Sequence, residues 1–189
     1  MAITYFSSDW HLGHANIIKY DGRPFSDTEH MNKSIMDNFN NLVKAEDEFY
    51  FLGDFCMGDH SKAESYLQQM VPCKKYFIAG NHDKKQTIEL FRKYGTYLGK
   101  MAEVKVQGKS ITLCHYAMRV WNHSHHGAYH LYGHSHGTLP EDPNSLSFDV
   151  GVNSWSYKPV SFAEVEYRMK SKSYQPVDHH GTRPHEITR

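Results

Sequence analysis

The stretch Lys75-Tyr76-Phe77-Ile78-Ala79-Gly80-Asn81-His82-Asp83 joins an apolar run directly to a group of polar side chains. The β-branched and aromatic residues in its first half are typical of a buried strand. A simple turn after that strand would need the glycine and the asparagine but not the histidine. The stretch therefore predicts a buried strand whose carboxyl end carries functional side chains.

Four further segments repeat this pattern of an apolar run followed by polar side chains. They are residues 3–7 before Asp9-Trp10-His11, residues 48–52 before Gly53-Asp54, residues 110–114 before His115, and residues 130–132 before Gly133-His134-Ser135-His136. Ligands of sheet proteins with helical connections collect beyond the carboxyl ends of strands, so the five groups can converge on one point. The glycines at positions 53, 80 and 133 permit a sharp exit from the strand and a close approach to whatever is bound.

The rest of the chain alternates between strand and helix patterns. We expect helices at residues 31–44, 61–70, 86–94 and 162 to about 170, and further strands at 103–106 and 146–152. Two stretches fit capping boxes at the starts of the first and last helices, Ser26-Asp27-Thr28-Glu29 and Ser161-Phe162-Ala163-Glu164. This order predicts an α/β protein with one mixed sheet, or two sheets, covered by helices.

The composition indicates a single domain without strong charge. The chain has 189 residues, 39% of them hydrophobic, which is enough for a substantial core. We expect one domain over residues 1–170 and a polar, flexible tail over residues 171–189. Lys and Arg together number 21, as do Asp and Glu, so the formal net charge is zero. This balance disfavours a general binder of nucleic acids or membrane surfaces.

The three cysteines form no Cys-x-x-Cys pair, so we expect neither a disulfide framework nor a thiolate zinc site. Residues 1–6 lack the basic and apolar regions of a signal peptide. No later stretch approaches the ~20 apolar residues of a membrane span. We therefore expect a cytoplasmic protein that does not bind membranes.

The polar groups at the strand ends offer carboxylate, amide and imidazole ligands but no thiolate. Such ligands suit Mn²⁺, Zn²⁺, Fe or Ni²⁺. Seven of the fifteen histidines also lie between positions 115 and 136. The candidate ligands exceed what one ion with an open position needs, which favours two ions bridged by a carboxylate. Two ions held ~3.5–4 Å apart can stabilise the attacking and leaving oxygens of a displacement at phosphorus.

The series of motifs resembles, in order and spacing, that of the calcineurin-like metallophosphoesterases. The motifs that carry the resemblance are Asp9-x-His11, Gly53-Asp54, Gly80-Asn81-His82-Asp83, His115 and Gly133-His134-x-His136. The resemblance extends from residue 3 to about residue 165. Residues 8–18 and 113–116 look like those of small, stand-alone bacterial and phage phosphoesterases. The resemblance implies an α/β/β/α four-layer sandwich with two mixed sheets.

The resemblance also implies a role for each motif. A first metal ion would be held by Asp9, His11 and His136, and a second by Asn81, His115 and His134, with Asp54 as the bridge. Mn²⁺ is the expected ion, with Zn²⁺, Fe or Ni²⁺ as alternatives. A metal-bridging hydroxide would attack phosphorus in line, while His82 would assist the leaving group and Asn81 would also contact the substrate.

One loop departs from the protein Ser/Thr phosphatases of this superfamily. Those enzymes follow the bridging Asp with Val-Asp-Arg-Gly, whereas this chain reads Asp54-Phe55-Cys56-Met57-Gly58-Asp59. The loop therefore lacks both the phosphate-binding Arg and the carboxylate that orients the catalytic His. Asp83 and Asp59 are candidates to orient His82 instead.

The expected substrate is a small phosphodiester or nucleotide, because the phosphatase loop is absent and the chain is small and neutral. Arg23 and Arg119 could replace the missing Arg as phosphate contacts. A phosphomonoesterase and a metal-binding but catalytically inactive scaffold module are the alternatives, and extended nucleic acid is a less favoured partner. A metallo-β-lactamase-like enzyme is disfavoured because no His-x-His-x-Asp-His run occurs early in the chain.

Overall fold

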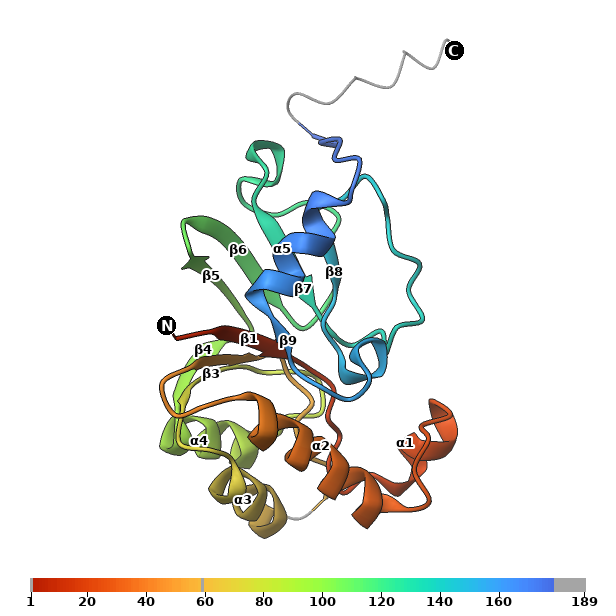
Figure 1. Cartoon of the computed structure of the whole chain (residues 1–189). Coiled ribbons are helices and arrows are strands. Elements are labelled where there is room, and N and C mark those ends of the chain that lie inside the picture. Colours follow the sequence, from red (N-terminus) through yellow and green to blue (C-terminus); the bar gives the residue numbers. More distant parts are fainter. Residues whose placement is uncertain (1, 59, 179–189) are drawn as a thin grey trace.

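Two β-sheets pack against each other in the computed structural model, which describes residues 2–58 and 60–178, and helices flank the sheets (Figure 1). The predicted α/β fold with two mixed sheets is thereby confirmed. Among the helices of these residues, none is both long and apolar enough to cross a bilayer.

The first sheet has the strand order β4-β3-β2-β1-β9. Its strands are β1 (Thr4–Ser7), β2 (Glu48–Phe51), β3 (Lys74–Ile78), β4 (Thr96–Gly99) and β9 (Val160–Ser161). Strands β1 to β4 run parallel, whereas β9 runs antiparallel to β1. The sequence pattern did not indicate β4 or β9, because β4 has no fully buried residue and β9 has only two residues. The parallel arrangement brings the carboxyl ends of β1, β2 and β3 to one edge.

The second sheet has the order β5-β6-β7-β8. Its strands are β5 (Met101–Val106), β6 (Lys109–Cys114), β7 (Tyr129–Tyr132) and β8 (Ser147–Asp149). Strands β6, β7 and β8 are parallel, so their carboxyl ends also share an edge. That edge is joined to the first sheet, because the Val152 amide donates to the Ser8 carbonyl at 3.1 Å. The two edges therefore meet where the polar motifs begin.

The described residues contain five α-helices and two short 3₁₀ helices. The α-helices are α1 (Ala15–Tyr20), α2 (Thr28–Leu42), α3 (His60–Gln69), α4 (Lys85–Tyr94) and α5 (Phe162–Lys170), and the 3₁₀ helices are η1 (Ser124–His126) and η2 (Val152–Trp155). Helix α1 was not predicted, since it is only six residues long. The capping box at Ser161 and Glu164 is confirmed at the start of α5.

The expected capping box at the start of α2 is wrong in its first residue. Asp27, not Ser26, is the cap, and its carboxylate accepts from the His30 amide at 2.8 Å. The Ser26 hydroxyl donates to Asp27 instead. A carboxylate is favoured at this place because the amino terminus of a helix carries partial positive charge.

Alternate residues of the first sheet belong to two different apolar clusters. Tyr5, Phe49 and Phe51 pack with residues of α2, α3 and α4 on the outer face. Phe6 and Tyr50 point the other way and join residues of the second sheet and of α5. This period of two is expected for a sheet buried on both faces, and it holds the strand ends in fixed positions.

The described part of the expected tail is held against the loop before β8 and the η1 helix. The Ser173 amide donates to the Pro143 carbonyl at 3.0 Å, and the Gln175 amide donates to the Asn144 carbonyl at 2.9 Å. The Tyr174 hydroxyl donates to the Ser124 carbonyl. Residues 171–178 are therefore docked through backbone contacts that their polar composition did not indicate. Residues 179–189 of the expected tail lie outside the described residues.

His130, one of the clustered histidines, is buried in β7 and has a structural role. Its Nδ1 lies 3.0 Å from the Thr112 carbonyl, and its Nε2 accepts from the Met118 amide at 3.1 Å. The ring is fully buried, and this burial lowers its pKa to about 4. The neutral ring satisfies both contacts, whereas a protonated ring would turn an N–H toward the Met118 amide.

We expect His130 to make the fold sensitive to acid. An unfolded histidine binds a proton near pH 6.5, whereas the folded one does so only near pH 4, so proton uptake favours the unfolded chain as the pH falls between these values. This difference between the two pKa values corresponds to about 3 kcal/mol in the free energy of unfolding. Urea unfolding can be measured from pH 7 to pH 4 in the presence of a chelator. The free energy of unfolding should fall less over this range for His130→Gln than for the wild type. Equal losses would contradict this role.

Candidate metal centre

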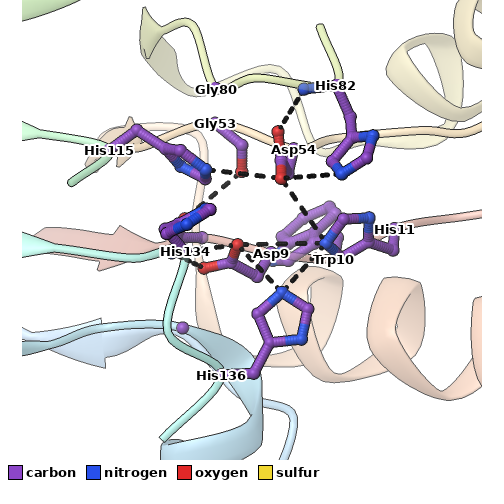
Figure 2. Close-up of polar contacts among 12 residues, drawn as sticks. Asp9, Trp10, His11, Gly53, Asp54, Gly80, His82, His115, His134 and His136 are labelled. Atoms are coloured by element: carbon purple, nitrogen blue, oxygen red, sulfur yellow. Dashed lines mark hydrogen bonds and ion pairs between the residues drawn. The ribbon is translucent and has the colours of Figure 1, made fainter. Parts of the chain in front are cut away.

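Polar side chains from both sheets meet beyond the carboxyl ends of their strands (Figure 2). The loop after β1 supplies Asp9 and His11, and the ends of β2, β3, β6 and β7 supply Asp54, His82, His115, His134 and His136. Figure 2 shows these side chains gathered around a common space. The structure thus brings together the groups that the sequence placed at separate strand ends.

Trp10 anchors the first of these loops in the core. It is fully buried, its indole N–H donates to the Ser7 hydroxyl at 2.8 Å, and its ring contacts Phe39 and Phe51. Asp9 and His11 on either side of it face the site. The apolar side chain between the two ligands therefore fixes their loop to the hydrophobic core.

Five predicted ligands have left-handed backbone conformations. The φ angles are 59° at Asp9, 48° at His11, 61° at Asp54, 65° at His134 and 50° at His136. Asp and His tolerate this region better than most residues, but each instance still costs about 1 kcal/mol or more and persists only where surrounding contacts hold it. Hydrogen bonds supply such contacts, since the amides of Asp9 and His11 donate to the carbonyls of Gly53 and Asp54, both at 3.0 Å.

The first predicted ligand set forms a compact group of Asp9, His11 and His136. The Nε2 atoms of His11 and His136 lie 3.1 Å apart, and Asp9 Oδ1 lies 3.4 Å from His136 Nε2 and 3.9 Å from His11 Nε2. Two atoms that each lie about 2.1 Å from one ion are separated by roughly 3 Å or more. The spacing of this set is therefore that of metal ligands.

A second compact group contains Asp9, Asp54 and His115. Asp54 Oδ2 lies 3.3 Å from His115 Nε2, and Asn81 Oδ1 lies 3.0 Å from the same nitrogen. Asp54 Oδ2 is also 3.6 Å from His11 Nε2 in the first set. This position between the two sets suits the bridging role implied for Asp54.

The atoms around His115 Nε2 are arranged so that a cation among them would be favourable. His115 Nδ1 lies 2.8 Å from the Leu52 carbonyl, which can only accept, so Nδ1 carries the proton. Nε2 therefore faces the oxygens of Asn81 and Asp54, which are acceptors too. Burial lowers the pKa of His115, but its hydrogen bond and ion pair with Asp54 outweigh burial and raise it, so either a second proton or a metal ion can satisfy these acceptors. A divalent ion satisfies such converging lone pairs, and the residues present fit one. The centre can therefore hold a divalent ion.

In the absence of a metal ion, protons on the histidines balance part of the negative charge of the buried carboxylates. Burial lowers the pKa of His136, but hydrogen bonds and ion pairs with Asp9 and Asp21 outweigh it and raise the pKa to about 9. Burial also raises the pKa of Asp54, but its interactions with His115 outweigh burial and lower it, so the carboxylate stays ionised at neutral pH. Ionised carboxylates buried among imidazoles are the donor set that divalent ions take.

His82 lies at the exposed side of the centre. Its Nε2 is 4.0 Å from Asp54 Oδ2, and 43% of its side chain is exposed. Asp83 does not orient it, since the Asp83 carboxylate accepts from the amides of Asp54, Phe55 and Gly80 at 2.8 to 3.1 Å. Asp83 therefore ties the loops after β2 and β3 together. Asp59, the other candidate to orient His82, lies outside the described residues.

The metal-binding role implied for His134 and the phosphate-binding role suggested for Arg119 both stay predictions. The His134 amide donates to Asp9 Oδ2 at 2.9 Å, but its exposed ring, 5.2 Å from that of His115, belongs to neither compact group. Arg119 is exposed and lines a cavity of about 440 Å³.

The placement of Arg23 corrects the expectation that it contacts a phosphate. Its side chain is fully buried, and its guanidinium donates to the carbonyls of Asp9 at 2.9 Å and Trp10 at 3.0 Å. Its Nε donates to Asp21 at 3.3 Å. The guanidinium faces the backbone of the first ligand loop because these acceptors surround it.

Comparisons with known proteins identify the family. The family model of the calcineurin-like phosphoesterase superfamily domain matches residues 24–163, so the chain belongs to this superfamily. An uncharacterized protein of Methanocaldococcus jannaschii is 39% identical over 161 residues, which cover 83% of this chain and 85% of that protein.

Two solved structures show the same fold. One is a protein of unknown function from Aquifex aeolicus, with a TM-score of 0.69 and 24% identity, covering 88% of this chain and 99% of that chain. The other is described as a novel archaeal phosphodiesterase, with a TM-score of 0.50 and 14% identity, covering 79% of this chain and 83% of that chain. These likenesses support the fold that the motifs implied.

Proposed function

We propose that this protein hydrolyses phosphoester bonds with the help of two divalent ions, Mn²⁺ first among them, and that its substrate is a small phosphodiester or nucleotide. The observation that carries the proposal is the convergence of acceptor atoms from Asp9, Asp54, His11, His115 and His136. Membership of the calcineurin-like phosphoesterase superfamily supports it.

Different residues of the chain would bind the metal ions and donate the proton. Asp9, His11 and His136 would hold one ion, and His115 and Asn81 the other, with Asp54 between them. The bound ions would activate a water molecule and neutralise charge on the phosphoryl group. His82 would donate a proton to the leaving oxygen, because it lies at the exposed side of the centre, where a substrate can reach it.

We propose that the leaving group extends into a cavity whose lining includes residues that follow two of the predicted ligands in the sequence, although none of the ligands themselves line it within the described residues. Its volume is about 440 Å³, and its walls include residues 117–119, which follow His115, and residues 139–140, which follow His136. Arg119 lies in this wall and would contact the substrate beyond the metal ions. Trp121, Tyr132 and Tyr174 also line the cavity, which suits a substrate with a ring rather than a bare phosphate.

Removal of metal tests this proposal. After dialysis against a chelator, hydrolysis of bis-p-nitrophenyl phosphate should be lost, and added Mn²⁺ should restore it, because the buried carboxylates and imidazoles cannot activate water alone. We expect the diester to be cleaved faster than p-nitrophenyl phosphate, and the reverse order would support the phosphomonoesterase. Full activity in the chelator would overturn the metal-dependent mechanism. Mn²⁺ binding without hydrolysis of a panel of diesters, nucleotides and monoesters would support the inactive scaffold.

A further inference from the structure

Asp21, the residue that follows α1, contacts three side chains, two of which come from distant parts of the chain. Its Oδ2 lies 2.6 Å from His136 Nδ1 and 3.0 Å from the side-chain nitrogen of Asn153. The Nε of Arg23 donates to the same oxygen at 3.3 Å. One carboxylate oxygen thus joins the segment after α1 to the loop after β7 and to the η2 helix.

Arg23 extends this contact to the first ligand loop. Its guanidinium donates to Asp21 with Nε and to the carbonyls of Asp9 and Trp10 with its terminal nitrogens. Because the Arg23 side chain is fully buried, these acceptors hold it in one orientation. Asp21 is therefore fixed relative to Asp9 as well as to His136.

The three histidines of the compact groups differ in what their second nitrogen meets. Nδ1 of His115 lies against the neutral Leu52 carbonyl at 2.8 Å. Within the described residues, Nδ1 of His11 has no hydrogen-bond partner. Only His136, of the three, places its Nδ1 against a carboxylate in residues 2–58 and 60–178. A carboxylate at this position fixes the proton on Nδ1, leaves the Nε2 lone pair for a metal ion, and makes that lone pair a stronger ligand.

We propose that Asp21 is a positioning residue that fixes the tautomer and orientation of His136 and so sets the metal affinity of the group formed by Asp9, His11 and His136. Arg23 and Asn153 hold Asp21 in place. The inference rests on the proposed function, since it requires that this group binds a divalent ion. It predicts that the two metal sites respond unequally when Asp21 changes.

Calorimetric titration of the metal-free protein with Mn²⁺ tests the inference. The wild type should bind two ions, and Asp21→Asn, which keeps the shape of the side chain but removes its charge, should bind one of them about 10- to 100-fold more weakly. The other ion should bind as before. At saturating Mn²⁺ the variant should recover most of its kcat, because the ligands themselves are intact. Asp37→Asn, at an exposed aspartate paired with Lys33 on α2, should bind both ions like the wild type.

A double-mutant comparison separates positioning from a general structural role. In a His136→Ala background, Asp21→Asn should weaken Mn²⁺ binding no further, because the residue through which it acts is gone. An equal loss in both backgrounds would overturn the inference, as would wild-type Mn²⁺ affinity in Asp21→Asn. If Asp21→Asn fails to fold, Asn153→Ala should weaken the same ion by a smaller factor, and unchanged binding would overturn the inference. A folded wild type that binds no Mn²⁺ would overturn the proposed function itself, and the inference with it.

Discussion

Asp54→Asn should lower kcat for phosphoester hydrolysis by about 1,000-fold or more, which corresponds to about 4 kcal/mol of lost transition-state stabilisation. Asp54 Oδ2 lies 3.6 Å from His11 Nε2 and 3.3 Å from His115 Nε2, so it is the carboxylate placed between the two ligand groups. The asparagine can still accept from the His82 amide, which Asp54 Oδ1 does at 2.8 Å. The variant should therefore fold and lose the charge alone.

Two measurements on the purified variant check this expectation. Steady-state kinetics with bis-p-nitrophenyl phosphate gives the loss in kcat, and metal analysis gives the number of Mn²⁺ ions bound per chain. We expect the variant to retain fewer ions than the wild type, while Asp37→Asn matches the wild type in both measurements. An Asp54→Asn protein with normal kcat would show that Asp54 does not bridge the ions. Asp9, which belongs to both compact groups, would then be the candidate bridge.

Gly80→Ala should have the second-largest effect, through displacement of the same carboxylate. A Cβ atom at position 80 would lie 2.2 Å from Asp54 Oδ1 and 2.7 Å from the Asp54 amide nitrogen. Both distances are far below van der Waals contact, so the loop after β2 or the loop after β3 must move. We expect a loss of about 1–3 kcal/mol in the free energy of unfolding and a fall in kcat of about 100-fold.

Gly108→Ala provides the control for this substitution. Gly108 lies in the turn between β5 and β6 with a φ of 85°, and a Cβ atom there would meet nothing within 4 Å. That variant should lose stability through backbone strain but keep its kcat, since no ligand moves. Thermal unfolding and steady-state kinetics on both variants test whether Gly80→Ala lowers kcat by displacing Asp54. Equal activities of Gly80→Ala and Gly108→Ala would contradict the steric argument.

The glycines show how the sequence can indicate a feature and miss its reason. We expected Gly53, Gly80 and Gly133 to permit close approach to a bound ligand. In the structure, a Cβ atom at Gly133 would lie 2.4 Å from Asp9 Oδ2, and one at Gly80 would meet Asp54. At these two positions the close approach is therefore to the protein's own carboxylates, whereas a Cβ atom at Gly53 would meet the Gly80 backbone and the His115 ring. The sequence cannot distinguish the two, because the neighbour comes from another strand.

Whether an element or a residue role was predicted depends on whether a pattern in the neighbouring sequence indicates it. The strands that lead to the motifs have only four to six residues, but each is at least half buried and ends in a polar motif, and each lies within a residue or two of its predicted bounds. Helix α1 and strand β9 are short, so their pattern is too brief to be recognised. Arg23 has no motif around it, and its solvent exposure depends on Asp9, Trp10 and Asp21, which surround it only in the folded chain.

The residue pattern alone predicted the α/β class and the grouping of Asp9, Asp54, Asn81 and the histidines at strand ends, and the resemblance of the motifs to a known family added the two mixed sheets. Apolar periodicity is a local property, and the order of motifs is a linear one, so both are visible in the unfolded chain. The folded structure was needed to show that Arg23 supports a ligand loop, that Asp83 ties two loops together, and that Asp21 meets His136 across 115 positions of the chain. Hydrogen bonds between distant segments depend on how strands pair and loops cross, and no local pattern records that geometry.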